Sequence, residues 1–535
     1  ANCYRNIFFT RRISSIRVSR VCIRDVRFFA RRPNRAGIKF FRNDYVGRVT
    51  KLENIVSTRR YCGSSKLNRA GSSDEVYASA RIPEAGGRRI PGILGSLVSL
   101  VSTDRAIRLH EHVDKLHREL GAIYRDRVGP VDAIFLNSPD DFQKIFRLEG
   151  RTPAHFLPEA WMLYNEIRQC SRGLLFMSGE EWLNFRRIMN RVMLVPDPSV
   201  TMSRPCEEAA RDLVDGWKRF ADNSQTIPEL ETRLYRWSIE VMLATLTGSS
   251  WQVYKTRVDK ETVDLARILH KIFSLSAKLS LLPTKLAMRL GLPVWREFCT
   301  VADEALRIVR ELVPEMARLE GDGMLSSMKK EGITDERDLV RIVTDLVIAA
   351  GDTTAFSTLW SLLLLAQNPS VQEKLYERIK NSDQKDILAD HFIKAIIKES
   401  LRLYPTAPFL TRFMPEDSVI AGYHVPKHKL IIMSIYSSGR DPKNFPEPND
   451  FRPERWMRNG RGTYEGVNNP HGSLPFALGA RSCVGRKLAE TQMILTLSEI
   501  VKNFRIECQN SARVKMILHL ISVPSEPLKL KLHTR

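Results

Sequence analysis

The stretch from Glu336 to Gln367 strongly constrains the fold, because it contains no proline and is apolar for most of its length. At 1.5 Å per residue, its roughly 30 residues predict a helix of about 45 Å, which spans a whole domain. A helix this long and apolar has to run through the core. Its centre nevertheless reads Ala-Ala-Gly-Asp-Thr-Thr over 349–354, and Gly, Asp and Thr are unfavourable inside a helix. Such a locally disfavoured cluster in a buried helix indicates a functional site.

Apolar residues recur at helical spacing along much of the rest of the chain, as in 205–222 and 301–318. Two short runs rich in Val and Ile, 418–425 and 428–435, predict strands instead. Glycine and proline gather between 83 and 92 and mark the entry into the folded region. We therefore expect a mainly α protein with small β-sheets. Residues 1–80 are predicted to be a targeting segment and linker, and residues 81–535 a single catalytic domain.

The positive charge of the chain is concentrated near its beginning. Residues 1–70 hold 18 Lys and Arg against three acids, a net charge of +15, which leaves only +7 of the total +22 for the other 465 residues. An Arg-rich, acid-poor segment is typical of a mitochondrial presequence, and a disordered basic tail is the alternative. Because the body is only mildly basic, the charge does not indicate a nucleic-acid-binding protein.

The first residues show no apolar run long enough for a membrane anchor. The eight cysteines form no CxxC pair, which fits a reducing compartment such as the mitochondrial matrix.

The segment Phe476-Ala-Leu-Gly-Ala-Arg-Ser-Cys-Val-Gly485 carries the strongest chemical signal. Its two glycines allow the backbone to approach a flat ligand closely, and Cys483 lies between them. Residues 486–500 predict a helix, whose N-terminus near Cys483 would favour a thiolate. A buried thiolate is an axial ligand of haem iron. The alternative is an inert buried cysteine, which the spacing F-x-x-G-x-R-x-C-x-G makes a poor explanation.

This spacing resembles the haem-binding loop of the cytochrome P450 superfamily. Four further motifs resemble that family and follow its order: W-x-x-x-R at 182–186, the oxygen-binding helix at 349–354, E-x-x-R at 399–402 and the meander P-E-R-W at 453–456. The resemblance covers about residues 85–535. It implies the P450 fold, with heme b (iron protoporphyrin IX) held between the long central helix and the Cys loop, and Cys483 as the metal ligand.

The resemblance also implies a role for each matching residue. The haem contacts would be Cys483, Phe476, Arg481, Trp182, Arg186, Arg412, Gly479 and Gly485. Arginine suits the two haem propionates because its planar fork binds a carboxylate through two N–H groups. Glu399, Arg402 and Arg455 would form a buried structural triad.

Asp352 and Thr353 match the family's acid and alcohol pair, which delivers protons during O2 activation. The alternative for Thr353 is a hydroxyl bonded to the carbonyl four residues earlier. One position departs from the family pattern. Ala350 stands where the family usually has glycine, and Gly351 follows, so the kink of the oxygen-binding helix is expected to be slightly displaced.

A mitochondrial member of this family takes its electrons from a small acidic ferredoxin, which needs a basic docking face. Lys394 and Lys398 lie four residues apart on the predicted E-x-x-R helix, and Arg486 and Lys487 follow the Cys loop. These four residues match the family's ferredoxin-binding positions; an ordinary solvated face is the alternative. The basic amphipathic stretch 264–296 is expected to contact the inner mitochondrial membrane peripherally, on its matrix side, and an ordinary pair of surface helices is the alternative.

The family resemblance implies an apolar pocket and therefore a lipophilic substrate. Segments 345–357, 399–409 and 471–483 are similar to the insect ecdysteroid 2-hydroxylase group, which implies oxidation of 2-deoxyecdysone to ecdysone in moulting-hormone biosynthesis. By family position, the pocket would include Leu346, Ala349, Ala350, Thr406, Ala407, Phe409 and Ile521. The alternatives are another mitochondrial sterol or xenobiotic hydroxylase, and a non-oxygenating haem-thiolate protein. The latter would not need the Asp352-Thr353 pair.

Overall fold

A computed structural model describes residues 81–85, 107–128, 131–197, 200, 202–223, 225–280, 282–319 and 321–535. The predicted targeting segment and linker, residues 1–80, lie outside these described residues.

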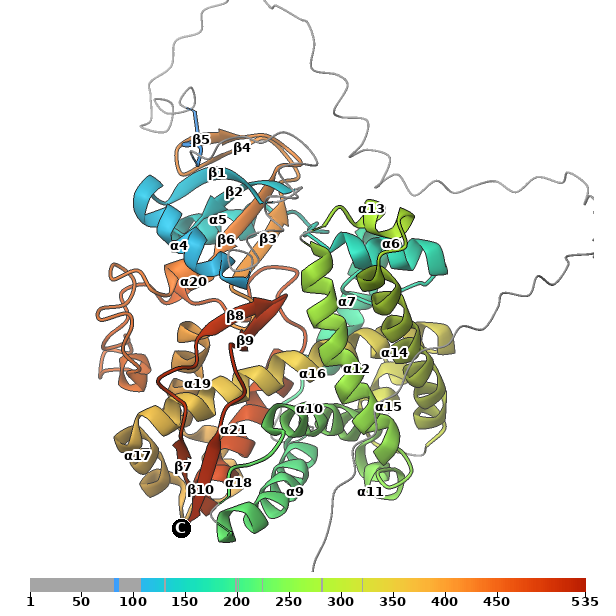
Figure 1. Ribbon diagram of the computed structural model, residues 1–535, viewed down its shortest axis with the longest axis vertical. Coiled ribbons are helices and arrows are strands. Elements are labelled where there is room, and N and C mark those ends of the chain that lie inside the picture. Colours follow the sequence, from blue (N-terminus) through green and yellow to red (C-terminus); the bar gives the residue numbers. More distant parts are fainter. Residues whose placement is uncertain are drawn as a thin grey trace, which may run out of the picture. The chain divides into compact units, whose positions relative to one another are not determined.

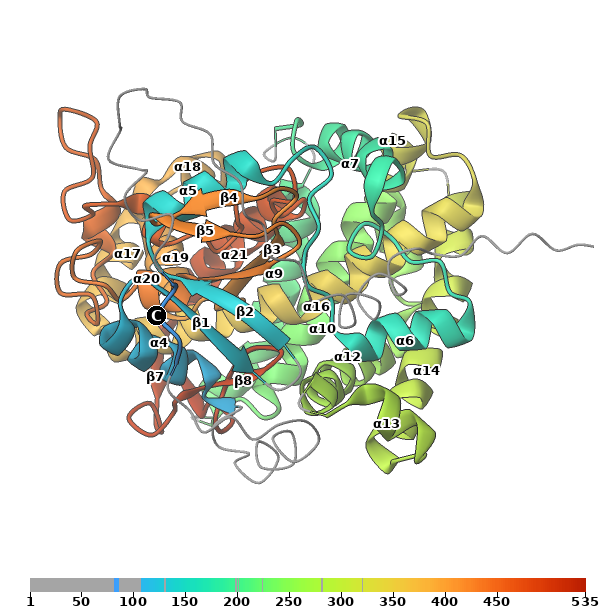
Figure 2. The same cartoon turned by 90° about the horizontal axis from the view of Figure 1, so that it is seen from above.

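One long helix, α16 (Glu336–Gln367), runs through the middle of the helical part of the chain (Figures 1 and 2). It has the predicted bounds: the Asp335 side chain caps its N-terminus by accepting from the Arg337 N–H, and Pro369 follows its end. By length and composition α16 could cross a membrane, but 83% of its most apolar window is buried inside the protein. It is therefore the core helix that the sequence predicts.

Four long helices pack against α16, namely α10 (Leu230–Thr247), α12 (Asp259–Ser280), α14 (Pro293–Arg318) and α21 (Arg486–Asn503). The E-x-x-R helix α19 (His391–Leu403) contacts both α16 and α21. These contacts bring the Cys loop, which ends where α21 begins, into the same helical core.

The remaining helices surround this centre. They are α4 (Leu109–Leu120), α5 (Pro139–Leu148), α6 (Glu159–Arg168), α7 (Gly179–Met193), α9 (Ser203–Asp222), α11 (Trp251–Tyr254), α13 (Thr284–Arg289), α15 (Met324–Lys330), α17 (Pro369–Ile379), α18 (Gln384–Ala389) and α20 (Ile435–Ser438). Short 3-10 turns are η2 (Gly248–Ser250), η3 (Pro453–Trp456) and η4 (Pro470–Gly472).

The largest sheet has the strand order β1-β2-β6-β3 and lies beside α4 and α5 (Figure 1). Its strands are β1 (Ile123–Val128), β2 (Val131–Leu136), β3 (Phe409–Phe413) and β6 (Leu430–Ser434). Strands β2 and β6 pair in parallel, with Ala133 opposite Leu430, and the other two pairs are antiparallel. Three two-stranded sheets join β4 (Ser418–Ile420) to β5 (Tyr423–Val425), β7 (Phe504–Cys508) to β10 (Leu530–Thr534), and β8 (Met516–His519) to β9 (Ile521–Pro524).

The architecture confirms the expected mainly α fold with small β-sheets. The predicted helices at 205–222 and 301–318 fall inside α9 and α14, and the helix after the Cys loop is α21. The run 418–425 forms the β4–β5 hairpin, whereas 428–435 contributes only β6 before α20 begins at Ile435.

Candidate active site

The Cys loop holds Cys483 immediately before the first turn of α21, which begins at Arg486. The Cys483 N–H donates to the Phe476 carbonyl at 2.9 Å, which closes the loop on itself. Burial raises the pKa of the Cys483 thiol, while a hydrogen bond from the Gly485 N–H opposes that rise. Gly479 has φ +77°, and a Cβ there would collide with the Glu149 carboxylate, so glycine is required at this position.

Space for a ligand lies beside the sulfur. Cys483 has exposed surface although the surrounding protein desolvates its thiol, so it borders an internal opening. Ala349 is likewise exposed, although the residues just before it on α16, 342–348, are all buried. Exposed surface on these two otherwise enclosed segments fits a large ligand between α16 and the Cys loop.

Three buried nitrogens around the Cys loop have no hydrogen-bond partner in the described part of the chain: Nε of Arg186, Nη2 of Arg412 and Nε2 of His155. Arg186 lies close enough to Cys483 to interact with its charge, and His155 lies close to Arg412 and Arg481. Burial, followed by the charges of Arg481 and Arg412, lowers the pKa of His155 to about 3. The unpaired guanidinium N–H groups are buried donors and favour anionic ligands, so the residues fit a haem: Cys483 would bind the iron, and Arg186 and Arg412 its carboxylates.

Arg481 makes different contacts from those of Arg186. Its Nε, Nη1 and Nη2 donate to the carbonyls of Pro153, Leu174 and Met177 at 2.9, 3.2 and 2.8 Å. Its guanidinium lies 4.1 Å from the ring centroid of Trp182, which is fully buried on α7. Arg481 therefore ties the Cys loop to the 153–177 segment and fixes the Trp182 indole.

A residue absent from the sequence predictions, Glu149, joins this cluster from the C-terminal end of α5. Its carboxylate accepts from Arg412 Nε at 2.5 Å and from the Ala480 N–H at 2.6 Å, and it is 4% exposed. Arg412 thus already has one carboxylate partner, with Nη2 left over. An acid at a helix end carries no motif of its own, so the sequence offered no sign of this contact.

Asp352 lies at the centre of α16, 1% exposed, and neither of its carboxylate oxygens has a hydrogen-bond partner among the described residues. Burial raises its pKa to about 8, and the nearby Tyr235 hydroxyl opposes that rise without reaching full hydrogen-bond geometry. The Thr353 hydroxyl donates to the Ala349 carbonyl at 2.7 Å, which is the alternative arrangement considered from the sequence. The Ala350 carbonyl accepts from the Ser238 hydroxyl of α10 at 2.8 Å.

We expect Asp352→Asn to stabilise the fold, and to do so increasingly from about pH 4 to about pH 8. The folded carboxyl binds its proton up to about pH 8, whereas the unfolded one loses it near 3.8. The stability that comes from the neutral acid is fully present below about pH 4, and it falls by about 1.4 kcal/mol per pH unit until about pH 8. Thermal unfolding of both proteins across this range measures the effect; a difference that does not change with pH would contradict it.

The E-x-x-R helix and the meander meet at Glu399, which is fully buried. Its carboxylate accepts from Arg402 Nε and Nη2 at 2.9 and 2.7 Å and from Arg455 Nε at 2.8 Å. The Trp456 indole also donates to it, at 2.8 Å, a contact that the sequence did not predict. The other guanidinium nitrogens bond to backbone carbonyls of the 439–466 segment, so the cluster anchors that loop to α19.

The residues predicted for the substrate pocket come partly together. The Thr406 hydroxyl bonds to Ser357 of α16 at 2.7 Å, and its carbonyl accepts from the Ser522 N–H of β9 at 2.9 Å. These two hydrogen bonds join the 404–408 segment, which includes Ala407, to α16 and to β9. Helix α16 carries Leu346, Ala349 and Ala350, and β9 begins at Ile521. Phe409 is half-buried and packs with part of its surface against a separate cluster around Tyr124 and Phe135.

The predicted docking residues lie on two helices in contact, α19 and α21. Lys394 is half-buried and Lys398 exposed; the Lys398 ammonium lies 3.3 Å from the Tyr464 hydroxyl. Arg486 pairs with Glu490 at 3.1 Å, and Lys487 donates to the Pro196 carbonyl at 3.0 Å. Arg486 and Lys487 follow the Cys loop directly, and three of the four side chains, those of Lys398, Arg486 and Lys487, already have partners.

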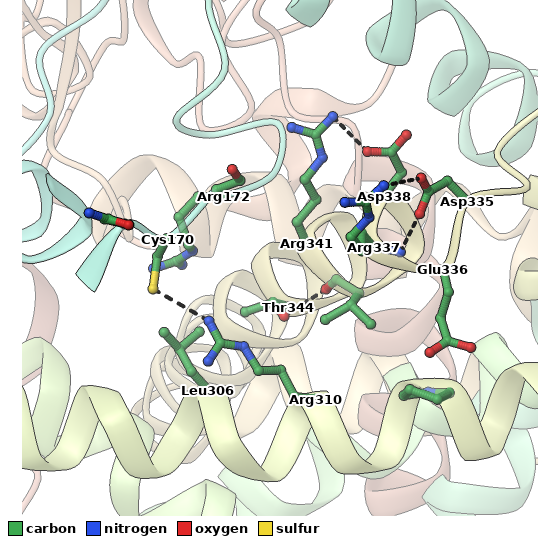
Figure 3. Close-up of a pocket in the computed structure, with 14 residues that line it drawn as sticks. Cys170, Arg172, Leu306, Arg310, Asp335, Glu336, Arg337, Asp338, Arg341 and Thr344 are labelled. Carbon is green, nitrogen blue, oxygen red and sulfur yellow. Dashed lines mark hydrogen bonds and ion pairs between the residues drawn. The ribbon is translucent and has the colours of Figure 1, made fainter. Parts of the chain in front are cut away.

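A pocket of about 550 Å³ lies elsewhere, at the N-terminal end of α16 (Figure 3). Its walls carry Arg310, whose Nη2 lies 3.4 Å from Cys170 Sγ, and the pairs Arg337–Asp335 and Arg341–Asp338. None of the predicted site residues lines it. A lining this highly charged does not fit a lipophilic substrate, so this pocket is separate from the site at Cys483.

Comparison with known proteins agrees with this geometry. The family model described as Cytochrome P450 matches residues 89–532. "Cytochrome P450 315a1, mitochondrial" of Drosophila melanogaster is 36% identical over 91% of this chain and 96% of its own length. The mitochondrial 1,25-dihydroxyvitamin D(3) 24-hydroxylase of Rattus norvegicus is 27% identical (83% of this chain, 87% of its own), and the mitochondrial cholesterol side-chain cleavage enzyme of Oncorhynchus mykiss is 28% identical (83% and 89%). The chain therefore belongs to the cytochrome P450 family, in its mitochondrial class.

Proposed function

We propose that this monooxygenase hydroxylates an ecdysteroid at carbon 2, converting 2-deoxyecdysone to ecdysone. The observation that carries the proposal is the resemblance of segments 345–357, 399–409 and 471–483 to the ecdysteroid 2-hydroxylase group. The structure supports it, because all three segments contribute to the region between α16 and the Cys loop. Leu346, Ala349, Ala350, Ala407 and Ile521 would present the apolar surface that a steroid needs.

The chemistry that we propose divides between the haem and the side chains around it. A haem held at this site would supply O2 activation, with Cys483 as its electron-donating thiolate ligand. Arg186 and Arg412 would bind its carboxylates and fix its orientation. Asp352 would hold a proton at its carboxyl and Thr353 would pass it on through its hydroxyl, while the apolar walls exclude water.

Reconstituted turnover tests the substrate. The haem-loaded protein, with a mitochondrial ferredoxin, its reductase and NADPH, should convert 2-deoxyecdysone to ecdysone. Binding of 2-deoxyecdysone should also shift the ferric Soret band. A haem-loaded enzyme that forms no ecdysone but oxidises another steroid would overturn the substrate proposal and leave the family unaffected.

We expect Thr353→Ala to uncouple the enzyme. Without the hydroxyl, proton delivery fails, so product formed per NADPH should fall by on the order of tenfold while hydrogen peroxide rises. Thr344→Ala is the matched control, because its hydroxyl also donates to the carbonyl four residues earlier on α16, at 2.7 Å. Peroxide and product are measured together; equal coupling in both variants would remove Thr353 from the mechanism.

Mitochondrial P450s receive electrons from a ferredoxin, and we propose that it docks on Lys394, Lys398, Arg486 and Lys487. Lys394→Glu with Lys398→Glu should raise the KM for ferredoxin by on the order of tenfold at low salt, because an acidic partner would meet two new negative charges. Lys115→Glu on α4, where Lys115 is exposed, is the control. Haem content must stay normal, since Lys398 also lies over the Trp456 ring. An unchanged KM would place the docking site elsewhere.

Membership of the mitochondrial class of P450s indicates that the protein is located in the mitochondrion. We propose that residues 1–80 are a mitochondrial presequence and linker, and that residues 81–535 form the single catalytic domain on the matrix side of the inner membrane. Within 264–296, helix α13 supports a peripheral membrane contact. Leu286 and Leu290 are 39% and 64% exposed there, beside the exposed Lys285 and Arg289.

A further inference from the structure

The buried acid at the centre of α16 needs a route by which protons reach it. Asp352 has no hydrogen-bond partner among the described residues, and both carboxylate oxygens are buried. Once such a carboxyl has given up its proton, it remains a buried unpaired charge until another proton arrives. The protein must therefore supply that proton through neighbouring side chains or through water between them.

Two side chains from other helices form a chain that ends at this acid. Tyr235 of α10 is 2% exposed, and the structure places its hydroxyl within interaction distance of Asp352. The same hydroxyl lies 3.2 Å from Nδ1 of His270 on α12. The His270 residue itself is exposed. Asp352, Tyr235 and His270 thus form a continuous series from the buried helix centre to a residue that has exposed surface and a partly desolvated ring.

Packing fixes this arrangement. Helices α10, α12 and α16 contact one another in pairs and lie side by side in both views (Figures 1 and 2). The Tyr235 and His270 rings meet edge to face with centroids 5.5 Å apart, and Phe356, one turn beyond Asp352, lies edge to face with Tyr235 at 5.5 Å. The ring of Phe356 also lies 6.3 Å from that of His270. Neither polar ring can turn away without breaking these contacts.

We infer that Tyr235 and His270 form a proton relay that refills Asp352, an inference that rests on the proposed role of Asp352 in O2 activation. When Asp352 is ionised, the Tyr235 O–H donates its proton to the carboxylate, directly or through one water. Nδ1–H of His270 donates to the Tyr235 oxygen in the same step, and Nε2 takes a proton from solvent. Every group except Asp352 ends with the proton count it began with, and His270 has exchanged one tautomer for the other.

The surrounding charges favour a relay of neutral groups. Burial, then the charge of Asp352, raises the pKa of Tyr235 well above 10, and Glu231 on α10 adds to this. Burial lowers the pKa of His270, so the ring is neutral near pH 7. His519 of β8 faces His270, and burial, His270 and Lys278 lower its pKa as well. Tyrosinate and imidazolium are therefore not resting states, and the proton moves by exchange of hydrogen bonds.

Hydrogen exchange at the Asp352 carboxyl tests the relay without substrate or reductant. The infrared C=O band of the protonated carboxyl is assigned in the haem-loaded ferric protein by its loss in Asp352→Asn. After transfer to D2O, the shift of this band should be about tenfold slower in Tyr235→Phe, which removes only the hydroxyl. His270→Gln should also slow it, because an amide keeps a hydrogen bond to Tyr235 but has no tautomer to exchange.

Tyr254→Phe is the matched control, since the Tyr254 hydroxyl also donates to a side chain, the Glu315 carboxylate of α14, at 2.9 Å. In turnover, Tyr235→Phe should increase peroxide release and the solvent deuterium isotope effect, and Tyr254→Phe should change neither. Wild-type exchange in both Tyr235→Phe and His270→Gln, or an equal slowing in Tyr254→Phe, would overturn the relay. A different outcome is that Tyr235→Phe and His270→Gln slow the exchange while Asp352→Asn leaves product formed per NADPH unchanged. That result would show that Asp352 has no role in turnover, and it would overturn the relay as well.

Discussion

Glu399→Gln should destabilise the protein by about 3–5 kcal/mol and abolish haem loading. The carboxylate is the shared acceptor of Arg402, Arg455 and Trp456, all of them buried, and an amide leaves both guanidinium charges without a counter-ion. The guanidiniums bind the loop from Gly439 to Gly466, which leads into the Cys loop. The loss should therefore reach Cys483 although Glu399 touches no haem-binding residue.

Urea unfolding and the ratio of haem to protein measure the two effects. Glu454→Gln is the matched control, because Glu454 lies in the same meander but makes a surface pair with Lys374 at 2.8 Å, 45% exposed. Exposed pairs of this kind contribute roughly 0–1 kcal/mol, so the control should load haem normally. Equal unfolding midpoints for the two variants would show that the triad does not anchor the loop.

Cys483→Ser should end monooxygenation while the fold survives. The loop closure uses the backbone N–H of residue 483 and the carbonyl of Phe476, and neither changes with the substitution. A serine hydroxyl does not ionise near pH 7, so the strong electron donation of the thiolate is lost. Cys299→Ser on α14, a half-buried thiol remote from the loop in sequence, should behave as wild type. Ecdysteroid or any other steroid product from Cys483→Ser would contradict the assigned ligand.

The sequence predicted the features that depend on local pattern. Absence of proline and sustained apolarity predicted α16 to the residue, and the glycine and cysteine spacing indicated the loop before α21. These features are encoded by neighbours along the chain, which is why a single sequence suffices.

Contacts between distant segments were beyond such reasoning. Glu149 meets Arg412 across more than 260 positions, Trp456 reaches Glu399 from another motif, and Tyr235 and His270 approach Asp352 from separate helices. Glu149, Tyr235 and His270 belong to none of the motifs, and the motif that contains Trp456 does not indicate its contact with Glu399, so only the packing of the chain brings these pairs together. The contact of Phe409 with the cluster around Tyr124 and Phe135 likewise depends on how the sheet packs.

The central claim is that Cys483 binds haem iron as a thiolate. The absorption spectrum of the reduced carbon monoxide complex tests it most directly. The wild-type protein should show the strongly red-shifted Soret band that thiolate ligation produces, and Cys483→Ser should lose that band while Cys299→Ser keeps it. A wild-type complex with the unshifted band of a nitrogen-ligated haem, or a shifted band that persists in Cys483→Ser, would contradict the account.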